Sequence, residues 1–302
     1  MIFFNGSTGG LGRYFLPEVL KAGLEGRALH SRLEEPQKLV EELNASLTGK
    51  KRPMQLTLVQ LAAMVSVPAC EQDPAKAHQI NVIDTLATVS AFISWAQKQS
   101  IRPRILYVSS GHVYDEKARG ERANEEDAVR PRSIYAKTKL DAENAIRALA
   151  AKDSAADLLI ARVFGLIAPG QPKHYVLPNF IQRVRDANLS QIPGLSNVRD
   201  YLDARDVCAH LAFLSGKDWY FSGQTVLNIC SGEPISLEDL LKKIVNVMGV
   251  DRSALQNKLS PAPGRPGDLP WIVGNPARLS AQTGRNPRSI PLDQTIADAL
   301  KS

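Results

Sequence analysis

The sequence predicts an α/β fold in which a doubly wound parallel sheet is joined by a smaller C-terminal lobe. Short apolar runs alternate with longer amphipathic runs over the first half of the chain. A glycine-rich turn separates the first apolar run from the first amphipathic one. After residue 164 the chain becomes rich in glycine and proline, which indicates a second lobe woven from separate pieces.

The elements follow from the periodicity of the apolar residues. Strands are expected at residues 1–4, 28–31, 56–62, 104–110 and 157–164. Helices are expected at residues 11–22, where Pro17 should bend the chain, and at 36–47, 78–98 and 135–151. Later elements are a helix at 179–187, a strand at 226–230 and a helix from Ser236. Since only one strand fits between the first two helices, the sheet should be short on that side.

Composition excludes several classes of protein. The 302 residues contain three cysteines, Cys70, Cys208 and Cys230, without a CxxC pair, so neither a disulfide framework nor a zinc site is expected. This favours a reducing, cytoplasmic location. No apolar run approaches the roughly 18 residues that span a membrane. The net charge of +6 is scattered, which fits an anionic small molecule better than a nucleic acid.

The stretch NGSTGGLG at residues 5–12 lies between a strand and a helix, the position of a dinucleotide-binding loop. Gly6 allows a sharp turn, Gly9 lets the backbone approach a pyrophosphate, and Gly12 lets the helix pack on the strand. With this loop at its first strand, the doubly wound sheet is predicted to be of the Rossmann type. The residues expected to bind the cofactor here are Gly6, Ser7, Thr8, Gly9, Gly10, Leu11 and Gly12.

The end of the second expected strand bears on the choice of cofactor. Sites selective for NAD usually place an acid there to accept the ribose 2'-hydroxyl. This chain has His30-Ser31-Arg32 instead, and Arg32 suits a 2'-phosphate. NADP (NADPH) is therefore favoured, NAD remains possible, and a plain surface role for Arg32 is the alternative.

One lysine lies on the apolar stripe of the helix expected at 135–151. At 3.6 residues per turn, Tyr135, Lys139, Ala142 and Ile146 share that stripe. A buried ammonium costs several kcal/mol unless it is paired. Either Lys139 snorkels to water beside an ordinary packing tyrosine, or the two residues form a functional pair.

Other motifs accompany this pair in a familiar order. Residues 109–114 (SSGHVY) end a strand, and YAKTK at 135–139 follows about 25 residues later. With the glycine loop, these motifs resemble the extended short-chain dehydrogenase/reductases that act on nucleotide sugars. Further matches run nearly end to end: Leu61-Ala62-Ala63, Asn81, residues 162–170, residues 199–203, residues 228–232 and residues 265–268.

The resemblance implies roles for particular residues. Tyr135 would supply the proton, Lys139 would lower its pKa and reach the nicotinamide ribose, and Ser110 would bind the substrate oxygen. The i,i+4 spacing brings the ammonium beside the phenol. The further cofactor-binding residues implied are Leu61, Ala62, Ala63, Asn81 and Phe164. The substrate-binding residues implied are His112, His174, Tyr175, Arg199 and Arg265, with Arg199 and Arg265 on the diphosphate.

The implied domains are residues 1–165 with 200–230 for the dinucleotide and 166–199 with 231–302 for the substrate-binding lobe. Gly111 and His112 replace the Asp-Glu pair of dehydratases, so dehydration is disfavoured. The chain looks most similar to the GDP-4-keto-6-deoxy-mannose reductase branch, which predicts reduction of a nucleotide-linked 4-keto sugar. An NAD-dependent nucleotide-sugar 4-epimerase and a non-enzymatic NADP-sensing regulator remain alternatives.

Some residues depart from the family pattern, and the family also implies an assembly. Gly165 stands where the family has a substrate-binding asparagine, and Asp115 stands where a glycine is usual. The sugar pocket is therefore expected to differ from that of other members. A nucleotide-diphosphate sugar is the expected partner, and the family implies a homodimer through the helices at 78–98 and 135–151.

Overall fold

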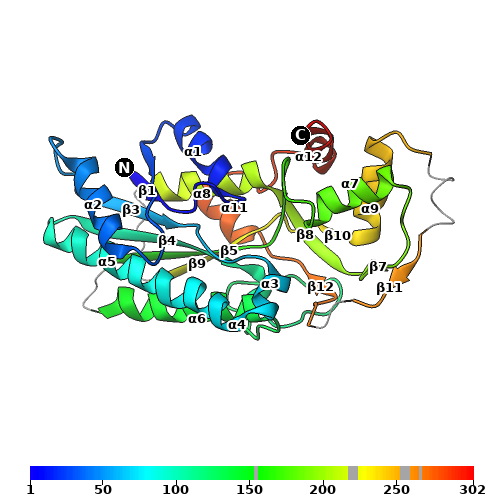
Figure 1. The fold of residues 1–302 in the computed structure, drawn as a ribbon, viewed down its shortest axis with the longest axis horizontal. Helices are drawn as coiled ribbons and strands as arrows, with labels where there is room; N and C mark the ends of the chain where they lie inside the picture. The colour runs from blue at the N-terminus through cyan, green and yellow to red at the C-terminus, as the bar shows by residue number, and fades with distance from the viewer. Residues whose placement is uncertain (153–155, 217–223, 252–258, 265–266) are drawn as a thin grey trace. The chain divides into compact units, whose positions relative to one another are not determined.

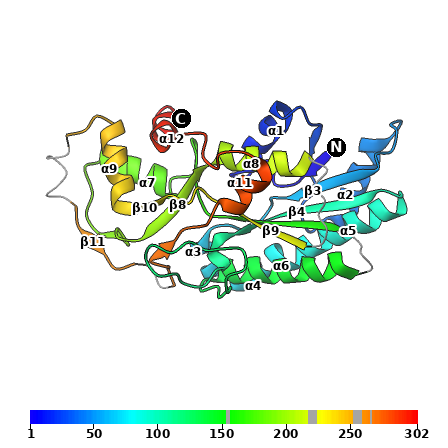
Figure 2. The ribbon, with the colours of Figure 1, turned by 180° about the vertical axis from the view of Figure 1, so that it is seen from behind.

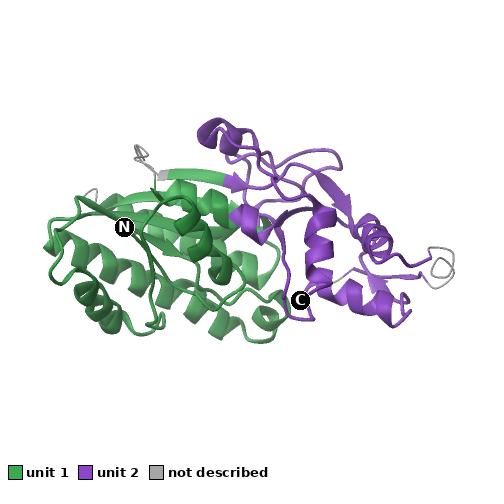
Figure 3. Ribbon diagram, turned by 90° about the horizontal axis from the view of Figure 1, so that it is seen from above, with its two compact units in different colours: residues 1–113, 131–162, 208–227 green, residues 114–130, 163–207, 228–302 purple. Residues whose placement is uncertain are grey.

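The computed structural model describes residues 1–152, 156–216, 224–251, 259–264 and 267–302. Figures 1 and 2 show the chain from two sides, and Figure 3 separates its two compact units. Unit 1 contains residues 1–113, 131–162 and 208–227, and unit 2 contains residues 114–130, 163–207 and 228–302. Four segments of the expected dinucleotide-binding domain therefore cluster with unit 2: residues 114–130, 163–165, 200–207 and 228–230.

Unit 1 is built on a six-stranded parallel sheet with the order β2-β1-β3-β4-β5-β9 (Figure 1). The predicted fold class is confirmed. Since β2 and β3 lie on opposite sides of β1, the strand order reverses there, and such a switch point opens a crevice at the carboxyl ends. The strands are β1 (Ile2–Phe4), β2 (Gly26–Ala28), β3 (Gln55–Gln60), β4 (Arg102–Ser110), β5 (Asp157–Val163) and β9 (Gln224–Ile229).

Helices cover both faces of this sheet (Figures 1 and 2). On one face α2, α5 and α6 share a buried cluster that includes Leu43, Phe92 and Ile146. The other face carries α1 and α8. The helices that contribute to unit 1 are α1 (Gly12–Lys21), α2 (Pro36–Leu47), α3 (Val67–Gln72), α4 (Pro74–His78), α5 (Thr85–Lys98), α6 (Ile134–Ala151) and α8 (Ala204–Gly216, from Cys208 onward).

Two expected elements differ from the structure. The helix expected at 78–98 is interrupted, because residues Gln79–Asp84 form a π-helix between α4 and α5. The strand expected at 28–31 was placed too late, since β2 ends at Ala28 and a loop follows. Both differences lie at the carboxyl edge of the sheet, where contacts with other segments override local propensity. Pro17 lies within α1 without ending it.

Unit 2 contains a small sheet in the order β10-β8-β12, with β6 also paired to β8. Its core includes Leu177, Phe180, Tyr201 and Ile244. The strands of unit 2 are β6 (Gly165–Ile167), β7 (Ile192–Pro193), β8 (Val198–Asp203), β10 (Pro234–Ser236), β11 (Pro261–Ala262) and β12 (Trp271–Ile272). The helices are α7 (Val176–Arg185), α9 (Leu237–Val247), α11 (Ala277–Thr283) and α12 (Leu292–Ala299).

Across the described ranges, no helix is both long and apolar enough to cross a membrane. In the same part of the chain, no three His, Cys, Asp or Glu side chains are grouped so that they could hold a metal ion.

Candidate active site

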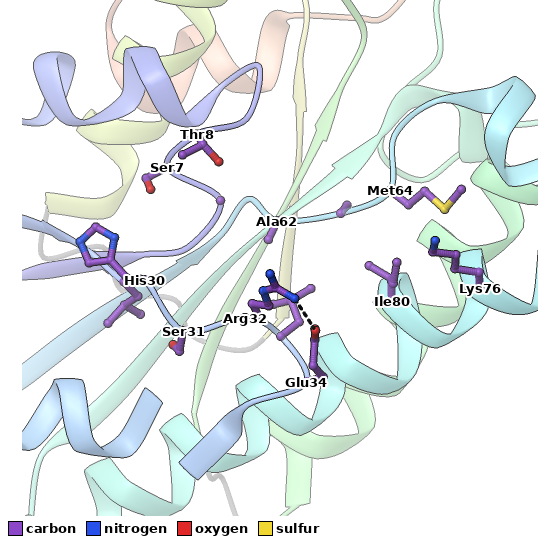
Figure 4. Close-up of a pocket in the computed structure, with 14 residues that line it drawn as sticks. Ser7, Thr8, His30, Ser31, Arg32, Glu34, Ala62, Met64, Lys76 and Ile80 are labelled. Carbon is purple, nitrogen blue, oxygen red and sulfur yellow. Dashed lines mark ion pairs between the residues drawn. The ribbon is translucent and has the colours of Figure 1, made fainter. Parts of the chain in front are cut away.

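A cavity of about 600 Å³ opens in unit 1 at the carboxyl ends of β1, β2 and β3 (Figure 4). It lies at the switch point of the sheet, where open α/β folds bind ligands. The loops after these three strands supply most of its wall, and α4 and the π-helix supply the rest. The lining residues are Gly6, Ser7, Thr8, Leu29, His30, Ser31, Arg32, Leu33, Glu34, Ala62, Ala63, Met64, Lys76 and Ile80.

The glycine loop is as tight as the sequence predicts. Gly6 has φ 72°, and a Cβ there would lie 2.8 Å from the amide nitrogen of Ala62. A Cβ on Gly12 would lie 1.9 Å from the carbonyl oxygen of Gly6, so a side chain would force the loop and α1 apart. The loop thereby presents Gly6, Ser7 and Thr8 to the cavity, and the bare turn at Gly6 lets a pyrophosphate approach the backbone. The other predicted residues of the loop, Gly9, Gly10, Leu11 and Gly12, are absent from the cavity lining.

Asn5, which the sequence analysis did not single out, joins the loops after β1 and β3. Its Oδ1 accepts hydrogen bonds from the amides of Leu61 and Ala62, both at 2.9 Å. Its Nδ2 donates to Gln60 Oε1 at 2.5 Å. The amides of Leu61 and Ala62 are therefore both held by protein. Of the three residues predicted to bind the cofactor here, Ala62 and Ala63 line the cavity and Leu61 does not.

Asn81 fixes the next part of the same loop. Its Oδ1 accepts from the Met64 amide at 2.7 Å, and its Nδ2 donates to the Met64 carbonyl and to Thr138 Oγ1, both at 3.0 Å. The side chain is buried, and it is absent from the cavity lining. In this structure Asn81 connects the loop after β3 to α6, while its neighbour Ile80 reaches the cavity.

The loop after β2 brings the charged side chains of Arg32 and Glu34 to the cavity wall (Figure 4). Arg32 lines the cavity with its side chain 79% exposed, and its Nη1 lies 3.8 Å from Glu34 Oε1. The segment His30-Ser31-Arg32 contains no acid, yet Glu34 reaches the same cavity from further along the loop. Glu42 of α2 accepts the amides of His30 at 2.8 Å and Ser31 at 2.6 Å, which anchors this loop.

The first turn of α6 holds Tyr135 at the carboxyl edge of the sheet. Ser133 caps the helix by accepting the Ala136 amide at 3.1 Å, and Glu71 accepts the Ile134 amide at 2.7 Å. Thr138 donates to the Tyr135 carbonyl at 2.8 Å. Tyr135 is half-buried, and the turn that carries it is fixed from both sides.

Lys139, one helical turn later, does not snorkel to water. Its side chain is buried, its Nζ donates to the Val108 carbonyl at 2.7 Å, and it lies 4.7 Å from the centre of the Tyr107 ring. The ring face attracts the ammonium through a cation–π contact. Burial lowers the pKa of Lys139 to about 8, and the Glu143 carboxylate opposes that shift.

The two adjacent serines at the end of β4 have different surroundings. Ser109 donates to the carboxylate of Glu143 on α6 at 2.5 Å. Ser110 is the last residue of the strand, and its Oγ accepts the amide of His112 at 3.2 Å. Since successive strand residues point to opposite faces, Ser109 is committed to the helix side. Ser110 stays the predicted substrate-binding serine, and His112 lies in the short helical turn Gly111–Val113 that follows it.

In unit 2, Arg199 is buried and bound to protein groups. Its Nη1 donates to the carbonyls of Val198 and Leu269, both at 2.8 Å, and its Nη2 lies 2.5 Å from Asp268 Oδ1. Asp268 belongs to the late motif at 265–268, so the structure joins two segments that the sequence analysis read separately. Arg265 lies outside the described residues.

The other residues predicted to bind ligands also lie in unit 2. The rings of His174 and Tyr175 are 4.6 Å apart just before α7, and burial raises the pKa of Tyr175. Phe164 is buried, with its ring centre 6.1 Å from that of Tyr114. Their roles with a cofactor or a sugar stay predictions.

Eight residues of the cavity wall were not among the predicted site residues: Leu29, His30, Ser31, Leu33, Glu34, Met64, Lys76 and Ile80. Met64 directly follows the predicted Leu61-Ala62-Ala63 segment, so a longer reading of that motif would have included it. Lys76 and Ile80 carry no sequence signal, because only the turn into the π-helix brings them to the cavity.

Known proteins resemble this chain in sequence and in fold. The model of the NAD dependent epimerase/dehydratase family matches residues 2–230. The GDP-6-deoxy-D-mannose reductase of Pseudomonas aeruginosa is 29% identical over 251 residues, which are 80% of this chain and 78% of that protein.

Two solved structures resemble the whole chain. RMD from Pseudomonas aeruginosa complexed with NADPH has a TM-score of 0.79 and 26% identity, and the match covers 99% of this chain and 97% of that one. The UDP-glucose 4-epimerase of Thermus thermophilus in complex with NAD has a TM-score of 0.82 and 21% identity, with the same coverage. The second likeness concerns the fold alone.

Proposed function

The chain belongs to the NAD dependent epimerase/dehydratase family, within the extended short-chain dehydrogenase/reductases, and from this we propose that it reduces a nucleotide-linked 4-keto sugar. The observation that carries the proposal is the buried Lys139, held against Val108 one helical turn after Tyr135. The 29% identity to a GDP-6-deoxy-D-mannose reductase supports a sugar reductase over other members of the family.

NADPH is the cofactor we favour. Gly6 and Gly12 allow the tight turn that a dinucleotide-binding loop needs, since a Cβ at either position would clash with backbone atoms, and Arg32 lines the cavity with donors suited to a 2'-phosphate. The similar Pseudomonas structure is complexed with NADPH. NAD stays possible, because Glu34 in the same wall has the carboxylate that a ribose 2'-hydroxyl would bind. When bound, the nicotinamide would supply the hydride to the sugar carbon.

The protein side of the reaction falls to three residues of unit 1. Ser110 would hold the keto oxygen, and Tyr135 would give that oxygen its proton as the hydride adds to carbon. A free tyrosine titrates near 10. The Lys139 ammonium one turn away would favour the phenolate that remains, and this would bring the pKa of Tyr135 toward working pH.

The remaining predicted residues would bind the nucleotide sugar. Arg199 and Arg265 would hold the diphosphate, and His112, His174 and Tyr175 would contact the sugar. Arg199 is paired with Asp268, so binding a diphosphate would require it to exchange that partner. We further propose a cytoplasmic homodimer whose interface includes α5 and α6, for which light scattering of the purified protein gives the mass.

The test is NADPH and NADH oxidation against a panel of GDP-, UDP- and dTDP-4-keto-6-deoxy sugars. Tyr135→Phe should lower kcat by about 100-fold or more, because it removes the proton donor, while NADPH still binds. Wild type that binds neither NADPH nor NADH, or a Tyr135→Phe enzyme with full activity, contradicts the proposal.

A 4-epimerase is the second candidate, favoured by Glu34 at the cavity. It would purify with tightly held NAD and interconvert nucleotide sugars without added cofactor. NADPH binding without turnover of any member of the panel would instead favour a regulatory role.

A further inference from the structure

Glu143 lies on the same face of α6 as Lys139, one turn further into the core. It is fully buried, with 0% of its surface exposed. Its Oε1 accepts from Ser109 Oγ at 2.5 Å and from Arg162 Nε at 3.1 Å, and its Oε2 accepts from Arg162 Nη2 at 2.7 Å. Three charge-assisted bonds therefore fix the carboxylate in the interior.

The two charged side chains of α6 bind consecutive residues of β4. Lys139 donates to the Val108 carbonyl, and Glu143 accepts from the Ser109 hydroxyl. Both side chains are buried, so water screens their interaction little. A carboxylate so placed favours the charged form of the lysine.

Other titratable groups lie on the elements packed against α6, but Glu143 is the anion that acts on Lys139. They are Cys70 and Glu71 on α3, Lys76 and His78 on α4, Asp84 on the π-helix, Tyr107 on β4, His112 after β4, and Tyr135 and Arg147 on α6 itself. Burial lowers the pKa of Lys139, and Glu143 and then Cys70 raise it. Burial also raises the pKa of the Cys70 thiol, so Cys70 is neutral near pH 7.

We propose that Glu143 is a positioning residue for the catalytic pair, whose buried carboxylate holds Lys139 in the charged form that Tyr135 requires. Arg162 holds the carboxylate in place and partly offsets its field. The same carboxylate accepts the hydrogen bond from Ser109 and so fixes the residue before Ser110. The inference rests on the proposed function only in taking Lys139 as the partner of Tyr135.

The experiment is an NMR titration of cofactor-free protein that carries ¹³Cε-labelled lysine, with the Lys139 signal assigned by its loss in Lys139→Arg. In Glu143→Gln, which keeps the shape and an acceptor for Ser109 and Arg162, the titration midpoint of Lys139 should fall by about one pH unit. The alkaline limb of the kcat/KM profile should move in the same direction.

Two matched variants distinguish the electrostatic effect of the Glu143 carboxylate on Lys139 from an effect of altered packing. Ser109→Ala removes one hydrogen bond but keeps the carboxylate, so the midpoint should stay in place. Arg162→Gln removes the competing cation, so the midpoint should rise. Opposite shifts in Glu143→Gln and Arg162→Gln cannot come from loosened packing alone.

The proposal is overturned if folded Glu143→Gln leaves the Lys139 midpoint unchanged. Should that variant not fold, a midpoint that stays or falls in Arg162→Gln overturns it equally. The titration needs neither substrate nor cofactor, so it is independent of the proposed function. Shifted midpoints in a protein that reduces no sugar would reject the proposed function and leave the role of Glu143 standing.

Discussion

Two arginine–glutamate pairs in unit 1 have the same chemistry and opposite surroundings. Arg162 and Glu143 approach to 2.7 Å, with side chains 5% and 1% exposed. Arg32 and Glu34 approach to 3.8 Å, with side chains 79% and 57% exposed. Water screens the second pair strongly and the first hardly at all. The charges of the pair that α6 forms with β5 are therefore fixed, and those at the cavity are free to exchange partners.

The difference matches what each place has to do. Arg32 can leave Glu34 for a phosphate at little cost, since an exposed pair contributes about 0–1 kcal/mol. Glu143 cannot leave Arg162 without stranding a charge in the interior. A ligand site needs the first property, and a constant field around Lys139 needs the second.

Breaking the buried pair should have the largest effect on stability. Glu143→Ala should lower the free energy of unfolding by about 3–5 kcal/mol, because Arg162 remains in the core without its carboxylate. Chemical denaturation followed by circular dichroism measures this. Glu34→Ala is the matched control and should change stability by less than about 0.5 kcal/mol. Equal losses in the two variants would remove the contrast between the pairs.

The buried charge of Lys139 should lower the stability of the protein, and Lys139→Met should recover on the order of 3 kcal/mol near neutral pH. Its folded pKa is about 8 against an ordinary 10.5, so folding disfavours the charged form. Below pH 8 both states carry the charge and the full cost applies. Between pH 8 and 10.5 the unfolded state binds more protons, so wild-type stability from this group rises with pH.

Denaturant unfolding at about pH 7 and about pH 9.5 checks the sign. The advantage of Lys139→Met over wild type should shrink at the higher pH, and the variant should be inactive at both. Lys137→Met, an exposed neighbour on the same helix, is the control and should show neither change. A variant less stable than wild type at neutral pH would mean that Lys139 holds the helix in place.

Local geometry explains which site residues the sequence could predict. Tyr135 and Lys139 share a stripe because a helix repeats every 3.6 residues, and Gly6 and Gly12 are required by a turn of a few residues. Both inferences use neighbours along the chain. The parallel sheet followed in the same way, from runs of apolar residues and their spacing.

Distant partners explain what the sequence did not predict. The carboxylate partner of Arg199 is Asp268, 69 residues away, and no pattern along the chain links the two residues. The π-helix and the reach of Glu34 likewise depend on segments that meet only after folding. The role of Glu143 was hidden because Ser109 and Arg162 contact it from two different strands.

The exposed Arg32–Glu34 pair should set the preference between NADPH and NADH. The changes in binding free energy should be smaller than the changes in unfolding free energy described above. Arg32→Ala should weaken NADPH binding about tenfold, because a charge-assisted bond to the 2'-phosphate is lost. NADH binding should change little. Glu34→Gln should act in the opposite direction, strengthening NADPH binding a few-fold by freeing Arg32 and removing a repulsive charge. Fluorescence titration of each variant with both cofactors measures the ratio of the dissociation constants for NADPH and NADH.

The response to ionic strength should distinguish the exposed Arg32–Glu34 pair from the buried Arg162–Glu143 pair. Raising ionic strength from about 0.01 M to about 0.15 M shortens the Debye length from about 30 Å to about 8 Å, so wild-type NADPH binding should weaken. The difference between wild type and Arg32→Ala should narrow over the same range. The Lys139 midpoint should hardly move, because Glu143 acts on it through protein and not through solvent. A midpoint as sensitive to salt as NADPH binding would place both pairs in the same dielectric environment and refute the distinction between them.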